Sequence, residues 1–154
     1  MVSAGQASAL ARLGVVASVQ PAFDAAWGGP AGMYAERLGR ERALAMNPYA
    51  MLAAAGVTLA FGSDSPVTPL DPWGGVRAAV RHQVAELGLP ADVALDAHTR
   101  GGWRAARIEG SGWLAPGAPA TYAVWDTTSL DQAIEHTPTC LRTVVDGHPV
   151  FGAA

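Results

Sequence analysis

The strongest constraint on the fold is a unit that occurs twice: a helical segment that ends in glycine and leads directly into a short apolar strand. Residues 3–14 begin with a serine suited to N-capping, end in glycine and continue into the β-branched run 15–19. Residues 47–56, with Asn47 as the expected N-cap, continue in the same way into the apolar run 57–61. Short apolar strands that alternate with helices are typical of buried parallel sheets, so we predict an α/β fold.

Three further stretches are expected in this part, one a loop and two helical. Residues 21–32 contain a Gly-Gly-Pro sequence, which predicts a long loop. Residues 71–88 predict a helix that Asp71 caps, with apolar side chains along one face. Two shorter helices are expected within 89–108, broken near Thr99 to Gly102.

From residue 110 onward the sequence changes to turns and alternating residues. Two strand-like runs meet at Asp146-Gly147, a dipeptide that favours a tight hairpin. We therefore predict two parts, residues 1–109 with the helices and the parallel strands, and residues 110–154 as a β-rich segment.

Charge and composition exclude several classes of protein. The formal net charge is −3 and the ten cationic residues are scattered arginines, so there is no basic field that would attract nucleic acid. No apolar run approaches the roughly 18 residues that cross a bilayer, so we expect no membrane partner. A single cysteine, Cys140, excludes an internal disulfide, and no signal peptide precedes the first helix, so the expected location is cytoplasmic.

The residue best placed for chemistry is Asp64. It comes three residues after the last apolar residue of the second strand, in the turn-forming run Gly-Ser-Asp-Ser-Pro. Catalytic groups of parallel α/β proteins sit where strands end at their carboxyl side, so Asp64 is placed to bind a metal or to act as a base. The alternative is a turn aspartate whose carboxylate bonds to its own backbone two residues on.

Several stretches of this chain resemble the amidohydrolase superfamily. They are GVTLAFGSDSPVTPLDPWGGVRAAV, the upstream GVVASVQPAF, the intervening LGRERA, and the downstream GWLAPGAPATYAVWD and TVVDGHPVF. The similarity extends over essentially the whole chain, and the GSDSPV element is its most specific part. Within the superfamily the chain is most similar to amidohydrolase family 3, in the branch that includes N-substituted formamide deformylases.

The resemblance implies a (β/α)8 TIM barrel with a small β-sandwich assembled from both chain ends. This chain matches the C-terminal portion only: residues 1–109 correspond to the last two barrel strands with their helices, and residues 110–154 to C-terminal strands of the sandwich. Asp64 matches the family's aspartate at the end of the eighth strand, which contacts the catalytic metal and takes a proton from the attacking water. The implied cofactor is a divalent metal, with zinc expected.

The other metal ligands of the family have no counterpart in this sequence. They are a His-x-His pair, a carboxylated lysine or equivalent acid, and two more histidines, whereas this chain has no lysine. Its own histidines are at least twelve residues apart, so none forms the short-spaced pair common in zinc sites. We expect packing or surface roles for His82, His98, His136 and His148.

Four residues near Asp64 are candidates for a substrate pocket. Gln20 ends the first strand, Phe23 and Trp27 follow it, and Ser65 adjoins Asp64. Phe23 and Trp27 either line an apolar pocket, as the resemblance implies, or anchor their own loop.

Two functional hypotheses follow. The first is a metal-dependent amidohydrolase that cleaves a C–N bond of a small amide or formamide-like substrate. The second is a non-catalytic truncated fragment that lacks the His and Lys ligands. Since two strands of a barrel leave open edges, the second hypothesis implies either a complementary N-terminal barrel segment or self-association through those edges.

Overall fold

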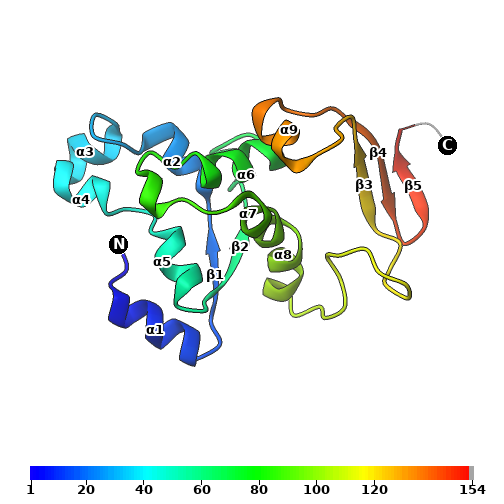
Figure 1. The fold of residues 1–154 in the computed structure, drawn as a ribbon, viewed down its shortest axis with the longest axis horizontal. Coiled ribbons are helices and arrows are strands. Elements are labelled where there is room, and N and C mark those ends of the chain that lie inside the picture. The colour runs from blue at the N-terminus through cyan, green and yellow to red at the C-terminus, as the bar shows by residue number, and fades with distance from the viewer. Residues whose placement is uncertain (153–154) are drawn as a thin grey trace.

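The computed structural model describes residues 1–152, which have a mixed α/β fold (Figure 1). The elements follow in this order: α1 (Ala4–Arg12), β1 (Val16–Val19), α2 (Pro21–Trp27), α3 (Met33–Leu38), α4 (Arg40–Leu44), α5 (Tyr49–Ala54), β2 (Thr58–Phe61), α6 (Pro72–Val80), the 3-10 helix η1 (Ala85–Leu87), α7 (Ala91–His98), α8 (Arg100–Ala105), β3 (Tyr122–Trp125), α9 (Leu130–Glu135), β4 (Cys140–Val145) and β5 (His148–Phe151). In the described part of the chain, β1 and β2 form a parallel pair, and β3, β4 and β5 form an antiparallel sheet in that order.

The predicted repeat of helix, glycine and strand is confirmed, and both copies use the same turn. At the end of α1 the amide of Gly14 donates to Ala11 and that of Val15 to Leu10. At the end of α5, Gly56 and Val57 donate in the same pattern. Both glycines have positive φ, 64° and 82°, as the left-handed position of such a helix end requires. The turn sends each helix directly into its strand.

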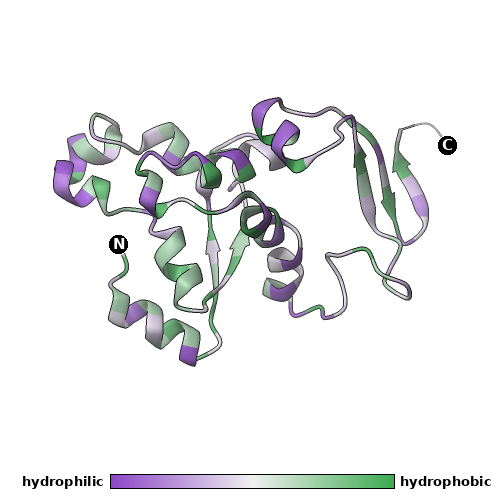
Figure 2. Ribbon diagram, in the orientation of Figure 1, coloured by the Kyte–Doolittle hydropathy of each residue, from purple (hydrophilic) through white to green (hydrophobic). Residues whose placement is uncertain are grey.

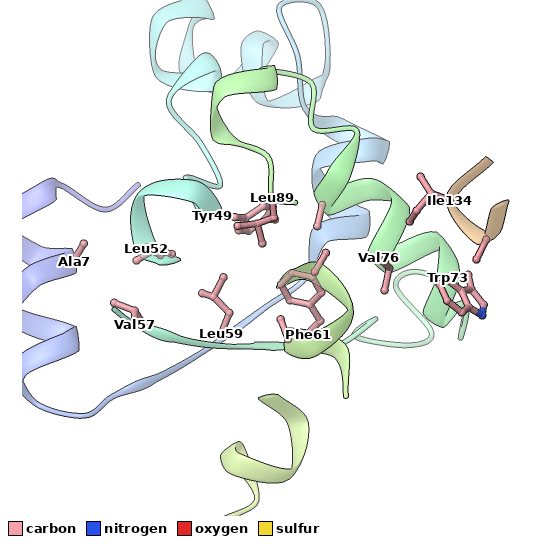
Figure 3. Close-up of a cluster of buried hydrophobic side chains, with 14 residues drawn as sticks. Ala7, Tyr49, Leu52, Val57, Leu59, Phe61, Trp73, Val76, Leu89 and Ile134 are labelled. Atoms are coloured by element: carbon pink, nitrogen blue, oxygen red, sulfur yellow. The ribbon is translucent and has the colours of Figure 1, made fainter. Parts of the chain in front are cut away.

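The core lies where helices α5 and α7 pack against β2 and where α6 packs on α7 (Figure 3). Leu59 and Phe61 of β2 are 6% and 8% exposed, and Tyr49, whose ring lies 6.1 Å from that of Phe61, and Val76 of the same cluster are 2% and 1% exposed. Burying such side chains stabilises the fold by roughly 1.5–3 kcal/mol each. This packing fixes the direction in which β2 leaves the core.

The loop predicted for residues 21–32 is wrong over its first half, because Pro21–Trp27 form helix α2. Pro21 occupies the first turn, where its missing N–H costs nothing, and the helix ends where Gly28 donates to the carbonyl of Asp24. Asp24 is buried on this helix.

The helix predicted for residues 71–88 begins as expected but ends early, at Val80. Asp71 is its N-cap, with the Asp71 carboxylate accepting from Gly74 N at 2.8 Å, so the predicted cap is confirmed. In a longer helix the amide of Gln83 would donate to the carbonyl of Ala79. Instead Gln83 donates to Asp24 at 2.9 Å, and the Ala79 carbonyl accepts from Leu89. These tertiary bonds replace the next helical turn.

The N-cap predicted at Asn47 is also wrong. Helix α5 begins at Tyr49, and Asn47 lies before it in the left-handed region with φ 54°. The side-chain amide of Asn47 donates to Asp24 at 3.4 Å rather than capping the helix.

At the C-terminal end the predicted hairpin is confirmed, since β4 and β5 meet at Asp146-Gly147, both with positive φ. The break expected from Thr99 to Gly102 is confirmed at Thr99, where α7 and α8 meet, but Gly101 and Gly102 lie within α8. The division between residues 109 and 110 stays a prediction. Among residues 1–152, no helix combines the length and apolar character needed to cross a membrane.

Candidate functional site

The two parallel strands end side by side, which creates the candidate site. Val19 pairs with Phe61 at the last position of the register, and Gly62 N donates to the Val19 carbonyl at 3.1 Å. Gln20 and Gly62 therefore leave the sheet next to each other at its carboxyl edge. In parallel α/β folds this edge is where ligands bind.

The loop after β2 is fastened by its serine and threonine side chains. The hydroxyl of Ser63 accepts from Ser65 N at 3.2 Å, and the Ser63 carbonyl accepts from the hydroxyl of buried Thr68. The amide of Val67 donates to the carbonyl of Asp64 at 2.8 Å. These bonds hold the loop without using the carboxylate of Asp64.

Asp64 itself is exposed, three residues beyond the end of β2. Its carboxylate makes no hydrogen bond or ion pair with any residue in 1–152, so the turn role in which it would bond to its own backbone is not realised. Its φ of 55° lies in the left-handed region, a position that costs a non-glycine residue of order 1 kcal/mol or more. A strained residue with a free carboxylate at a strand end can bind a cation or accept a proton.

The four predicted pocket residues do not form one cluster. Phe23 and Trp27 are half-buried and contact each other, with ring centroids 4.7 Å apart, and Trp27 also lies 6.4 Å from Tyr34 of α3. Gln20 is the first residue before α2 and makes no side-chain cap. Ser65 is exposed beside Asp64. The aromatic pair thus lies on α2, whereas Ser65 lies in the loop that carries Asp64.

A cavity of about 170 Å³ lies beside the end of β2. It is bounded by α2, the loop after β2, and the facing ends of α6 and α7. Its lining residues are Ala22, Gly62, Ser63, Pro69, Leu70, Asp71, Pro72, Gly75 and His98.

With this geometry in place, comparison with known proteins assigns the chain to a family. A model of the amidohydrolase family matches residues 1–151. The chain belongs to the amidohydrolase family. YtcJ of Bacillus subtilis is 28% identical over 157 residues, which cover 92% of this chain and 28% of that protein.

Solved structures of hydrolases share the fold. An uncharacterized metal-dependent hydrolase from Pyrococcus furiosus has a TM-score of 0.67 and 29% identity, covering 78% of this chain and 25% of that one. N-isopropylammelide isopropylaminohydrolase from Burkholderia multivorans has a TM-score of 0.68 and 21% identity, covering 96% and 34%. The chain thus spans only about a quarter to a third of the length of the relatives it matches.

The potential metal ligands in the described part of this amidohydrolase chain do not by themselves form a site for a catalytic metal. Within residues 1–152, no three His, Cys, Asp or Glu side chains are grouped closely enough to hold an ion. A catalytic zinc uses three protein ligands, and Asp64 supplies one carboxylate. Of the histidines tested as replacements, His82 is buried and His98 packs edge-on against Phe61 at 6.3 Å, in accord with the packing roles expected for them.

Sequence reasoning missed Asp24, which is 2% exposed and bonded to residues far away in the chain. The signal was present in the run Phe-Asp-Ala-Ala-Trp, where one acid lies among apolar residues one turn before a glycine. It was hidden because the run was interpreted as a loop.

Proposed function

We propose that this chain provides part of the active site of a metal-dependent amidohydrolase that cleaves a C–N bond other than a peptide bond, in an amide or formamide-like small molecule. The observation that carries the proposal is the free carboxylate of Asp64 at the carboxyl edge of two parallel strands, in a member of the amidohydrolase family. The structural relative named as an isopropylaminohydrolase supports C–N chemistry. The finer branch we propose is that of the N-substituted formamide deformylases.

In this proposal Asp64 contacts the metal and moves the proton. A divalent metal, zinc in our proposal, would supply a lowered water pKa and a polarised carbonyl once the remaining ligands were present, with Asp64 as the ligand from this chain. The Asp64 carboxylate accepts a proton from the water whose oxygen attacks the carbonyl carbon. It then gives the proton to the amine nitrogen as the C–N bond breaks. Exposure suits this role, because an acid that makes no internal bond is free to change its partner.

The surrounding residues take supporting roles. We assign Gln20 and Ser65 to polar contacts with the substrate, because both lie at the carboxyl edge of the sheet. Phe23 and Trp27 provide an apolar wall of two contacting rings. This arrangement is the one expected if β1 and β2 are the last two strands of a (β/α)8 barrel.

The remaining metal ligands, in this proposal, come from a complementary N-terminal barrel segment. Three observations support it. Among residues 1–152 no three potential metal ligands are grouped, the chain spans only about a quarter to a third of its relatives, and in this described part the outer edges of β1 and β2 pair with no further strand. Unpaired strand edges readily accept a further strand. Self-association through the same edges is the competing way to cover them.

The C-terminal sheet presents a further surface for an added segment. Its edge strand β3 borders a cavity of about 550 Å³ between the sheet and helices α6 to α8, lined by Trp73, Trp103, Trp113 and Trp125 among others. The indole nitrogen of Trp73 is buried without an acceptor, and in Figure 3 it lies on the side of the ring away from the core cluster. Figure 2 shows hydrophobic residues along these strands, where Leu141 and Phe151 are 52% and 57% exposed. An added segment would cover this surface.

Activity of the assembled protein tests the proposed reaction. The chain is co-expressed with the polypeptide encoded immediately upstream, loaded with Zn²⁺, and assayed for amine release from an N-substituted formamide, an acetamide and a dipeptide. We expect release from the first two and none from the dipeptide. Release from the dipeptide alone, or from none of the three, contradicts the proposed reaction.

The second candidate function, a fragment without catalysis of its own, is favoured because no three potential metal ligands are grouped among residues 1–152. It predicts that the purified 154-residue chain retains no stoichiometric zinc and releases no amine until the upstream polypeptide is added. One zinc per chain together with hydrolysis by the chain alone would overturn this reading.

A further inference from the structure

Asp24 is the one acidic residue among residues 1–152 that is buried, with 2% of its surface exposed. Its Oδ2 accepts from the backbone amide of Gln83 at 2.9 Å, and its Oδ1 accepts from the side chain of Asn47 at 3.4 Å. Nε2 of His82 lies 3.3 Å from the same Oδ1, without the alignment of a full hydrogen bond. A buried carboxylate is stable only when donors surround it, and here three donors converge on one group.

The contacts of His82 define its protonation. Nδ1 accepts from the backbone amide of Val84 at 2.9 Å, so the ring proton is on Nε2, the nitrogen that faces Asp24. The ring of Tyr49 packs edge-on over the imidazole at 5.5 Å. The pair therefore consists of a carboxylate and a neutral imidazole in a dry setting.

Two neighbouring phenols, those of Tyr49 and Tyr34, lie within the electrostatic influence of Asp24. Burial, and then the negative charge of Asp24, raise the pKa of Tyr49 and of Tyr34 above the ordinary tyrosine value. Arg81 adjoins His82 in the chain, but its guanidinium pairs with Glu135 at 2.6 Å. The donors on Asp24 are therefore neutral groups.

The carboxylate joins three segments that are remote in sequence. Asp24 lies on α2, Asn47 precedes α5, and His82 and Gln83 follow α6, at separations of 23 and 59 residues for the two hydrogen bonds. Gly28 is part of the arrangement, since a Cβ there would lie 2.4 Å from the Asp24 Oδ1. The positive φ of Asn47 is a further local cost of bringing its amide to Asp24.

We propose that Asp24 is a positioning residue that holds α2, and with it the rings of Phe23 and Trp27, in place beside the strand ends. Phe23 precedes Asp24 directly and Trp27 follows it within the same short helix. α2 packs on α6, and the Asp24 contacts fix that packing at the ends of α5 and α6. That these two rings form a wall of a substrate pocket rests on the proposed function. That Asp24 positions Trp27 does not depend on it.

The test replaces one oxygen of the carboxylate. In Asp24→Asn the amide keeps one acceptor and places an NH₂ donor against donors. The full chain is labelled with 5-fluorotryptophan, and ¹⁹F NMR follows each indole, with Trp27→Phe identifying the Trp27 signal. We expect the Trp27 signal to shift and broaden in Asp24→Asn while that of Trp103, on α8, stays unchanged.

A milder variant and a matched control complete the design. Asn47→Gly removes one donor to Asp24 but keeps the left-handed backbone. It should therefore shift the Trp27 signal in the same direction as Asp24→Asn does, by a smaller amount. If Asp24→Asn does not fold, Asn47→Gly decides the outcome. Asp92→Asn, which removes an exposed carboxylate on α7, should move neither signal. An unchanged Trp27 signal in folded variants, or an equal shift of all tryptophan signals, overturns the proposal. Neither result depends on metal or turnover, so the proposed reaction is judged separately.

Discussion

Two adjacent glycines of α8 allow a sharp test of how this helix lies against the parallel strands. A Cβ added at Gly101 would lie 2.1 Å from the carbonyl oxygen of Leu59 and 3.1 Å from the Cα of Ala60, both backbone atoms of β2. Because backbone atoms cannot rotate away, Gly101→Ala must push the helix off the strand by roughly 1 Å, given the usual packing distance. At Gly102 a Cβ would meet nothing within 4 Å.

Both substitutions place alanine rather than glycine in a helix, but only the one at Gly101 also overpacks the contact with β2. Alanine in a helix is more favourable than glycine by roughly 0.5–1 kcal/mol, which applies at both positions. Overpacking costs about 1–3 kcal/mol and applies at Gly101 alone. Gly102→Ala should therefore raise the free energy of unfolding by about 0.5–1 kcal/mol. Gly101→Ala should lie about 1–3 kcal/mol below it.

Urea denaturation followed by far-UV circular dichroism measures both variants against the parent chain. Equal slopes m are expected, so that the midpoints report stability alone. If Gly101→Ala and Gly102→Ala stabilise the chain equally, within about 0.5 kcal/mol, α8 does not pack on β2 as described.

Two further predictions concern single side chains. Asp71→Ala, which removes the N-cap of α6, should lower the free energy of unfolding by about 0.5–2 kcal/mol in the same urea assay. The control Glu109→Ala, on an exposed turn, should change it by less than about 0.5 kcal/mol. Equal effects of the two substitutions would contradict the capping role of Asp71. The pKa of Tyr49 is raised in the folded state, so its stabilising effect is complete below the unfolded pKa near 10 and is lost as the pH rises beyond it. The urea midpoint of Tyr49→Phe should accordingly fall less than that of the parent between about pH 9 and 11, and parallel declines would refute this.

The parts of the fold that the sequence predicted correctly depend on local chemistry. Gly14 and Gly56 end their helices through the same backbone turn, and the runs that follow them have side chains suited to buried strands. The cap at Asp71 and the hairpin at Asp146 likewise need only neighbouring residues. Such features can be predicted because every group involved lies within a few positions in the sequence.

The failures have a common physical cause in Asp24. Helix α6 ends early because the amide of Gln83 donates to Asp24, and Asn47 leaves its expected cap because its side chain donates to the same carboxylate. The loop assigned around Asp24 is a helix that buries it. A partner 59 residues away leaves no periodic trace in the sequence, so these outcomes required the tertiary structure.

For the candidate site, the sequence indicated that Asp64 follows the second strand, but it did not indicate that the carboxylate would make no hydrogen bond within the described part of the chain. The Gly-Ser-Asp-Ser-Pro run was compatible with a carboxylate that fastens its own turn. The structure gives that task to Ser63 and Thr68 and leaves Asp64 exposed. Which side-chain oxygen closes a turn depends on the backbone path of the whole loop, and that path cannot be deduced from residue types alone.

The central claim is that the Asp64 carboxylate accepts the proton during C–N cleavage, and one comparison of rates tests it most directly. The measurement is kcat/KM for amine release from an N-substituted formamide by the zinc-loaded assembly of this chain with the upstream polypeptide. Asp64→Asn is compared with the parent and with Asp92→Asn. We expect a fall of about 10²–10⁴-fold in Asp64→Asn and no change in Asp92→Asn. A kcat/KM for Asp64→Asn within about twofold of the parent would contradict it.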